Sequence, residues 1–449
     1  MTALSASATN ETPKDMKTFF TIWVGQLISM LGSGLTQFAL GVWIYDQTKQ
    51  ATPFAITVLL GSLPRILLLA FAGSIADRFN RRRILIVTDT LSALLTLFIF
   101  IVLNAGGLQL WHIYLISTLG SIFSAFQEPA YTASISMIVP KEKLGSANGM
   151  AQMGQAITSV LTPVLAGALF VFIGLNGIIL IDFVTFFFAI GALILVHIPQ
   201  PERTPEHKDK NIWQDIQFGL AFLRERKGLM GLLLYYAMVN FLLNWSAVLL
   251  IPMVLSRFTA DVLGLIQTVM GVGMLAGSIT MSAWGGAKRR IPTAIGFITL
   301  GVAGLVIAGL QPNPWFIGGG IFLLMFCVPL ASGNSQVVFQ TKVPREIQGR
   351  VFSVRSTISQ SMMPLAFLTA GPLADKFFEP LMRDGGALAN TFIGQLIGTG
   401  AGRGIGLMAI IAGLTGILVS VLVYLNPRIR NVEDELPDAL PAEAATPPS

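Results

Sequence analysis

The sequence predicts an all-α integral membrane protein with twelve transmembrane helices in two six-helix bundles related by a parallel repeat. Three observations support this prediction: a low charge content, long apolar segments at regular intervals, and matching segments in the two halves. Of the 449 residues, 53% are hydrophobic and 12% are charged, whereas a soluble domain carries about 25% charged residues. The 45 glycines fit as well, because glycine is more frequent in membrane helices than in soluble ones.

The composition also argues against several functions. The net charge of +6 comes from short basic runs between apolar segments, so we expect no nucleic-acid partner. The single cysteine, Cys327, cannot form a disulfide within the chain. The three histidines show no metal-binding spacing, and the glycine cluster at 398–406 follows no strand and precedes no P-loop lysine. We therefore expect no enzymatic activity, no cofactor, no metal site and no ATP hydrolysis within this chain.

A membrane-spanning helix needs about 20 apolar residues, and twelve segments of the sequence satisfy this requirement. They are expected near 19–45, 53–76, 84–104, 111–138, 146–173, 177–197, 229–255, 262–284, 292–310, 315–339, 351–378 and 404–425. The first six spans and the last six are separated by residues 198–228.

The spans divide the chain into five parts. These are a flexible N-terminus (1–16), an N-terminal bundle (17–197), a cytoplasmic linker (198–228), a C-terminal bundle (229–425) and a disordered tail (426–449). The linker places four apolar side chains on one helical face, followed by basic residues, which predicts an amphipathic helix on the inner membrane surface. The four are Ile212, Ile216, Leu220 and Leu223. The tail is rich in proline, alanine and acidic residues, a composition typical of disorder.

The distribution of lysine and arginine predicts the orientation in the membrane. With the N-terminus inside, 22 of the 29 basic residues fall in inner segments and 5 in outer segments. Because positive residues concentrate on the cytoplasmic side, we expect both termini to be cytoplasmic, in a multi-pass protein of the inner (plasma) membrane. The N-terminus lacks the basic-then-apolar layout of a cleaved signal peptide.

A repeat becomes visible when the two halves are aligned at one constant offset of 204 residues. The segment VPKEKLG at 139–145 then matches VPREIQG at 343–349, and AGSI at 72–75 matches AGSI at 276–279. AGAL at 166–169 matches AGPL at 370–373. Parallel repeats of this kind occur in transporters, where two halves rock about a central binding site. The architecture therefore favours a carrier, although a fold alone does not establish a function.

The loop between the second and third spans, GSIADRFNRRR at 73–83, concentrates an acid and four arginines. It resembles the signature G-x-L-A-D-R-x-G-R-R of the major facilitator superfamily, with isoleucine in place of leucine and asparagine in place of glycine. The resemblance covers roughly residues 17–425 and implies two bundles with a central cavity.

The same resemblance implies a cytoplasmic gate that is closed while the cavity faces outward. Asp77 would face the N-terminus of the eleventh helix, whose dipole favours a carboxylate, and the arginines would pair with acids of the N-terminal half. The expected gate residues are Gly73, Asp77, Arg78, Arg81 and Arg82. Two simpler interpretations remain open: the arginines set only the topology, and Asp77 caps only its own helix.

Other segments resemble the macrolide-efflux subgroup of drug–proton antiporters. These are SMLGSGLTQFALGVWIYDQT at 29–48, FQEPAYTASISMIVPKEKLGSANGM at 126–150 and VPREIQGRVFS at 343–353. In the fifth span, residues 162–167 resemble the antiporter signature G-P-x-x-G-G, but Thr162 and Ala166 replace two of its glycines.

Ionisable residues within spans are costly and often functional. Arg65 precedes Asp77 by twelve residues and Glu128 precedes Pro140 by twelve, which places both about 18 Å from the inner loops. We expect these two side chains to pair on the cavity side, with Glu128 as the protonation switch; a static pair is the alternative.

Two further acids lie within spans. Asp89 is expected to pair with the loop arginines, and Asp182 to form structural hydrogen bonds.

Amides, one tyrosine and methionines form helical stripes in four spans and are expected to line a cavity for a large, apolar, neutral or weakly cationic ligand. Hydrogen bonding between helices is the alternative. The candidates are Gln26, Met30, Gln37, Tyr236, Asn240, Asn244, Asn334, Gln336, Gln360 and Met363.

The sequence thus predicts a secondary active exporter of hydrophobic small molecules, with the proton or another cation as coupling ion and the chain as a monomer in lipid. Export of a specific metabolite such as a siderophore is an alternative, and a non-transporting sensor or enzyme on a transporter scaffold is a second.

Overall fold

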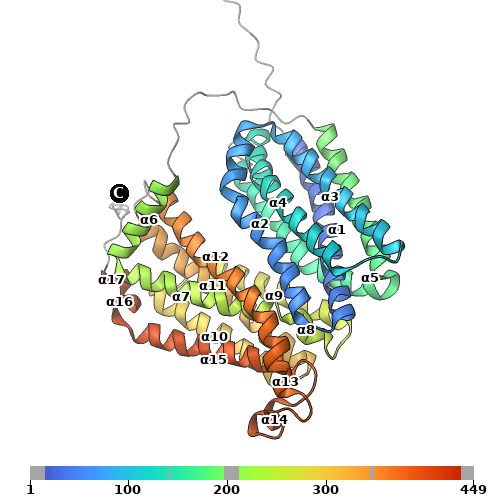
Figure 1. Ribbon diagram of the computed structural model, residues 1–449. Coiled ribbons are helices and arrows are strands. Elements are labelled where there is room, and N and C mark those ends of the chain that lie inside the picture. Colours follow the sequence, from blue (N-terminus) through green and yellow to red (C-terminus); the bar gives the residue numbers. More distant parts are fainter. Residues whose placement is uncertain (1–15, 141–142, 197–211, 344–347, 436–449) are drawn as a thin grey trace, which may run out of the picture. The chain divides into compact units, whose positions relative to one another are not determined.

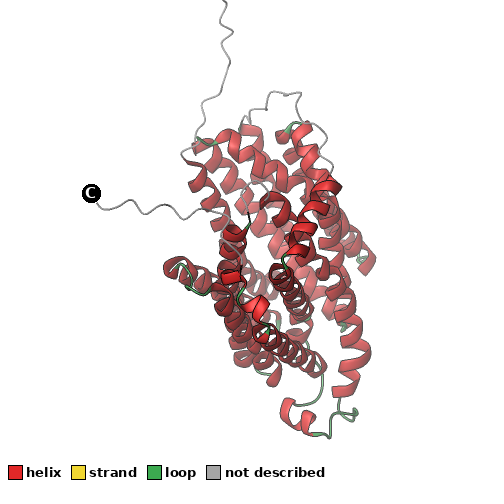
Figure 2. Cartoon of the chain, turned by 90° about the vertical axis from the view of Figure 1, so that its left-hand side faces the viewer, coloured by secondary structure: helices red, strands yellow, loops and turns green. Residues whose placement is uncertain are grey.

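The computed structural model describes residues 16–140, 143–196, 212–343 and 348–435, and the regular elements in these ranges are helices (Figure 2). The longer helices are α1 (Met16–Thr48), α2 (Ala51–Arg78), α3 (Arg81–Asn104), α4 (Leu110–Ile138), α5 (Leu144–Leu195), α6 (Ile212–Glu225), α7 (Lys227–Ala247), α9 (Ala260–Trp284), α10 (Arg290–Leu310), α11 (Pro314–Lys342), α12 (Gln348–Leu373) and α15 (Arg403–Leu425). The shorter ones are α8 (Leu250–Leu255), the π-helix η3 (Ala374–Phe378), α13 (Glu379–Met382), α14 (Phe392–Ile397), α16 (Pro427–Arg430) and α17 (Val432–Glu435).

The expected spans each fall on a helix. Within the described ranges, nine helices are long and apolar enough to cross a membrane. One of them, α5, contains both the fifth and the sixth expected span, and its helical geometry is broken between them at Gly174, with φ 62° and ψ −169°. This backbone conformation suits glycine, which has no Cβ. The remaining expected spans coincide with α4 and with α12 together with η3.

The chain forms two compact units. The first comprises Met1–Leu40 and Leu60–Pro205, and the second comprises Gly41–Leu59 and Glu206–Ser449. In the first unit, α3 packs against both α4 and α5. One buried cluster of this unit includes Phe19, Trp23, Leu85 and Leu193, and it joins the ends of α1, α3 and α5.

In the second unit, α10 lies between α11 and α15, and α7 packs against α12 (Figure 1). Small residues permit this close packing. A Cβ on Gly277 of α9 would lie 2.2 Å from the carbonyl oxygen of Phe326 in α11. The Gly273-x-x-x-Gly277 pattern in α9 therefore marks a helix contact, as small residues do in membrane proteins.

The linker and the tail differ from the sequence prediction. The expected linker helix is present as α6, but Leu223 is fully buried and Leu220 packs against the core of the second unit. The apolar face of α6 therefore contacts protein at these two positions rather than the membrane surface. In the tail, α16 and α17 are ordered up to Glu435, where disorder was expected.

A carboxylate explains why this part of the tail is ordered. The two oxygens of Glu433 accept hydrogen bonds from the backbone N–H groups of Arg290 and Ile291, each at 3.1 Å. The side chain thereby caps α10, whose first N–H groups have no partner within the helix. The apolar side chains of Ile429 and Val432 are buried beside it.

Candidate transport site and coupling residues

The first unit contains an ion pair in the middle of its helices. Arg65 lies near the centre of α2, and its Nη1 is 2.9 Å from Oε2 of Glu128 in α4. The expected contact between these side chains is therefore present. The side chain of Arg65 is 42% exposed and that of Glu128 is 58% exposed, so the protein does not enclose the pair. Charges at this depth face water-filled space or protein in preference to hydrocarbon.

Local sequence features position this pair. Pro64 precedes Arg65 in α2, and the Arg65 N–H donates to the hydroxyl of Ser121 in α4 at 3.0 Å. Pro129 follows Glu128 in α4. A proline inside a helix removes one backbone hydrogen bond, so both charged side chains sit beside a weakened point in their helices.

A buried carboxylate of α3 is bound by the residue that precedes Glu128 in α4. Asp89 of α3 is 2% exposed. Its oxygens accept hydrogen bonds from Nε2 of Gln26 in α1 at 3.0 Å and from Nε2 of Gln127 in α4 at 2.5 Å. Among the described residues, amides rather than the expected loop arginines bind this carboxylate. Since Gln127 and Glu128 are adjacent, α4 presents one side chain to Asp89 and the next to Arg65.

The second buried acid of this unit, Asp182 in α5, is also 2% exposed. It accepts hydrogen bonds from the hydroxyls of Ser33 at 3.1 Å and Thr96 at 3.3 Å. It thereby links α1, α3 and α5, which agrees with the structural role expected for it. The close approach of α1 depends on Gly32, where a Cβ would lie 2.1 Å from the hydroxyl of Thr185.

In the second unit, two of the expected cavity residues bond to polar side chains of α12. In α7, Nδ2 of Asn240 donates to the hydroxyl of Ser359 in α12 at 2.5 Å. In α12, Nη1 of Arg355 donates to Oε1 of Gln336 in α11 at 2.7 Å. The guanidinium of Arg355 also lies 4.1 Å from the ring centre of Phe339, a favourable cation–π geometry.

Exposure separates the cavity candidates into two groups. Those that are partly or fully exposed are Met30, Gln37, Tyr236, Asn240, Asn244, Gln336, Gln360 and Met363. In contrast, Asn334 is fully buried, bonds to Leu330 O at 2.8 Å and accepts from the N–H of Ala287 at 3.1 Å. It therefore holds the turn after α9 in the structure. Gln26, which is 9% exposed, belongs to the Asp89 network.

Part of the expected gate lies outside the residues whose side chains the structure describes, namely Gly73, Asp77 and Arg78. The other two arginines are described. Arg82 donates to the carbonyl oxygens of Leu193 at 2.8 Å and Ile194 at 2.7 Å, so it binds the C-terminal end of α5. Arg81 donates to the sulfur of Met137 at 2.8 Å.

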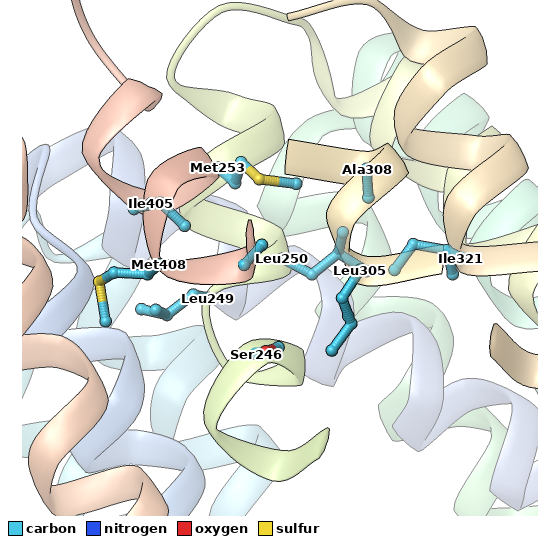
Figure 3. Close-up of a pocket in the computed structure, with 10 residues that line it drawn as sticks. Ser246, Leu249, Leu250, Met253, Leu305, Ala308, Ile321, Ile405 and Met408 are labelled. Atoms are coloured by element: carbon cyan, nitrogen blue, oxygen red, sulfur yellow. The ribbon is translucent and has the colours of Figure 1, made fainter. Parts of the chain in front are cut away.

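Two cavities of the second unit lie among apolar side chains. One, of about 20 Å³, lies between α7, α8, α10, α11 and α15 (Figure 3). It is far too small for a drug, although a volume of this size accommodates about one water molecule. The other, of about 280 Å³, is lined by α7, α12 and α15 and includes Trp245. Neither cavity includes Arg355 or Gln336 in its lining.

Known proteins resemble this chain along most of its length. Residues 22–367 match the model of the Major Facilitator Superfamily. Macrolide efflux protein A of Streptococcus pyogenes is 30% identical over 367 residues, which cover 80% of this chain and 89% of that protein. The multidrug efflux pump Tap of Mycobacterium bovis is 25% identical over 374 residues, covering 79% of this chain and 87% of the pump.

A solved structure shows the same fold. A bacterial homologue of the human lysosomal transporter Spinster, in an inward-facing and unoccupied conformation, aligns with a TM-score of 0.71 at 14% identity. The alignment covers 96% of this chain and all of that one. The chain therefore belongs to the Major Facilitator Superfamily and is a multi-pass membrane transporter.

Proposed function

We propose that the chain exports hydrophobic, macrolide-like small molecules from the cytoplasm by alternating access, in exchange for protons. We further propose that it acts as a monomer in the plasma membrane with both termini inside. We also propose the two bundles and the connecting linker that the sequence predicts. The export direction and substrate class rest on the relatives, which are named as macrolide and multidrug efflux proteins.

The single observation that carries the coupling is the partly exposed ion pair of Arg65 and Glu128 in the middle of their helices. A carboxylate that releases its proton regains its attraction to Arg65, and one that binds a proton loses it. Protonation of Glu128 therefore weakens the link between α2 and α4 and frees the guanidinium. A proton-coupled carrier needs an ionisable group that binds the proton more tightly when the cavity faces one side of the membrane than when it faces the other.

The substrate side of the proposal rests on the second unit. The half-buried side chains of Tyr236 and Asn240 in α7 face α11 and α12. The hydroxyl of Tyr236 is 3.5 Å from the carbonyl oxygen of Ala331, and Asn240 bonds to Ser359, which lies one turn of α12 from Arg355. These groups donate and accept hydrogen bonds among aromatic and aliphatic neighbours. Binding sites of this composition are apolar with a few polar groups that orient the ligand. The arginine favours a ligand with hydrogen-bond acceptors, such as ester carbonyls, over a strongly cationic one.

Inverted membrane vesicles with an imposed pH gradient, acid inside, test this function. We expect macrolides and hydrophobic dyes to accumulate in vesicles that contain the protein and not in vesicles without it. Accumulation should stop when an ionophore collapses the gradient. Accumulation that continues after the collapse would exclude proton coupling. If none of the hydrophobic compounds accumulates and a polar metabolite does, the proposed substrate class is wrong.

A further inference from the structure

The start of α2 is capped by a side chain that lies 323 residues away in the sequence. One carboxylate oxygen of Asp375, in η3, accepts from the N–H of Ala51 at 2.9 Å. The other accepts from the N–H of Thr52 at 2.8 Å and from its hydroxyl at 2.5 Å. The carboxylate therefore binds three donors at the positive end of the α2 dipole, where a negative charge is favoured.

The chain does not provide this cap locally. The residue before α2 is Gln50, whereas serine, threonine, aspartate and asparagine are the preferred caps at that position. The N–H groups at the start of α2 therefore depend on Asp375 or on water. A cap supplied from a distant helix is conditional: it exists only while the two helix ends are in contact.

The backbones of the two helices also approach closely beside this cap. A Cβ on Gly371 of α12 would lie 2.6 Å from the Cα of Thr52 and 3.2 Å from the Cβ of Ala55. Ala55 is fully buried. The absence of a side chain at Gly371 thus allows the end of α12 to lie directly on the first turns of α2.

The sequence around Asp375 resembles the signature at the other end of α2. Residues 370–377 read AGPLADKF, and residues 72–79 read AGSIADRF. Five of the eight positions are identical, and lysine replaces arginine directly after the acid. A glycine and an aspartate four residues apart thus stand at the C-terminal end of α2 and where α12 continues into η3. This likeness is separate from the 204-residue repeat, which places Met281 opposite Asp77.

We propose that Asp375 and Gly371 form a latch that closes the carrier at the end of the bundle opposite the Asp77 loop. Asp375 is a positioning residue of the transport cycle: its cap holds the start of α2 on α12, and the contact breaks when the carrier opens on that side. The π-helix that contains Asp375 fits this role, because such turns are frequent at functional sites. The proposal rests on alternating access, and the proposed orientation places this latch on the outer side.

A second carboxylate four residues further on provides a matched control. Glu379 accepts hydrogen bonds from the N–H of Gly402 at 3.1 Å and of Ile405 at 3.0 Å. It therefore caps α15, a helix of its own half of the sequence. Both acids follow α12 in the chain and cap another helix, Asp375 from η3 and Glu379 from α13. Of these two, Asp375 is the one that reaches a helix of the N-terminal half.

The test measures how fast a buried cysteine reacts from outside the cell. In a Cys327→Ala background, an Ala55→Cys reporter lies beneath the latch, and intact cells are treated with a membrane-impermeant maleimide. We expect Asp375→Asn to raise the labelling rate about tenfold over the parent, the effect of a 1.4 kcal/mol shift toward the open state. Asp375→Glu should stay near the parent rate, and Glu379→Gln should change it less than about twofold.

The labelling needs neither a substrate nor a pH gradient, so its result does not depend on the proposed substrate or coupling ion. A labelling rate for Asp375→Asn equal to the parent rate overturns the latch. A rise of the labelling rate in Glu379→Gln as large as that in Asp375→Asn also overturns it, because it would show that the loss of either cap destabilises the protein in general. If Asp375→Asn fails to reach the membrane, Thr52→Val removes one donor and should give a smaller rise. Labelling of Thr52→Val at the parent rate then overturns the latch as well.

Discussion

Replacement of Glu128 by glutamine tests the coupling mechanism, because it removes the charge and keeps the shape of the side chain. Glutamine cannot bind and release a proton in the physiological range, so Arg65 would have a permanently neutral neighbour. We expect Glu128→Gln to bind and exchange substrate but to lose accumulation driven by a pH gradient.

The energy of the ion pair sets the expected loss of stability. At 2.9 Å, two unit charges attract by about 6 kcal/mol at an effective dielectric constant of 20. The side chains are 42% and 58% exposed, and exposed ion pairs contribute a net of about 0–1 kcal/mol. The melting temperature should therefore fall by no more than about 2 °C. Transport should change far more, because with one proton exchanged per neutral substrate a gradient of about one pH unit supports about tenfold accumulation.

The assay compares wild type, Glu128→Gln and a control variant in inverted vesicles. The control is Asp46→Asn, which breaks the ion pair with Lys49 at 2.5 Å near the end of α1. Both partners of that pair are about two-thirds exposed, at 66% and 67%, so its loss should leave accumulation intact. Glu128→Gln should equilibrate substrate without concentrating it. Accumulation by Glu128→Gln at the wild-type level would refute the assignment of Glu128 as the protonation switch.

Three further variants test other parts of the structure. In Asp89→Asn, the N–H₂ group of the new amide faces one of the two glutamine amides that donate to Asp89, so two donors meet. The variant should lose about 1–3 kcal/mol of stability. Unchanged thermal unfolding in detergent would contradict this. Arg355→Gln should raise the KM for ester-containing substrates about tenfold and leave the maximal rate within about twofold, and an unchanged KM would remove Arg355 from the site. Gly277→Val places side-chain atoms against the backbone of Phe326 and should abolish folded protein. Gly296→Val is the control, because a Cβ at Gly296 meets open space and should be tolerated. Equal abundance of the two variants in the membrane would refute the packing argument.

Much of the fold could be predicted because the bilayer restricts the chain locally. A span requires a continuous apolar segment, and each expected span coincides with a helix in the described residues. Even the division of α5 at Gly174 was visible as an interruption between two apolar segments. The contact of Arg65 and Glu128 was predictable for a similar reason, because opposite charges at equal depth in the membrane lower their energy by forming an ion pair.

The rest depends on contacts that no local pattern reveals. Asp89 was expected to bind nearby arginines, but helix packing directs it inward to amides of α1 and α4. Asn334 has the polarity of a cavity residue, yet its orientation buries it against the turn after α9. The composition of the tail is typical of disorder. The order of its first part depends on one glutamate that bonds to α10, more than a hundred residues away in the sequence, and composition does not reveal such a contact. The cap from Asp375 to α2 could not be predicted from the sequence for the same reason.

The most direct test of the proposed proton exchange is to follow the vesicle pH gradient itself with a pH-sensitive dye while substrate is added. The exchange mechanism predicts that a macrolide added to inverted vesicles dissipates a preformed gradient in the wild-type protein, and that Glu128→Gln leaves the gradient unchanged. Uptake of the macrolide by the wild-type protein with no movement of protons would contradict the mechanism.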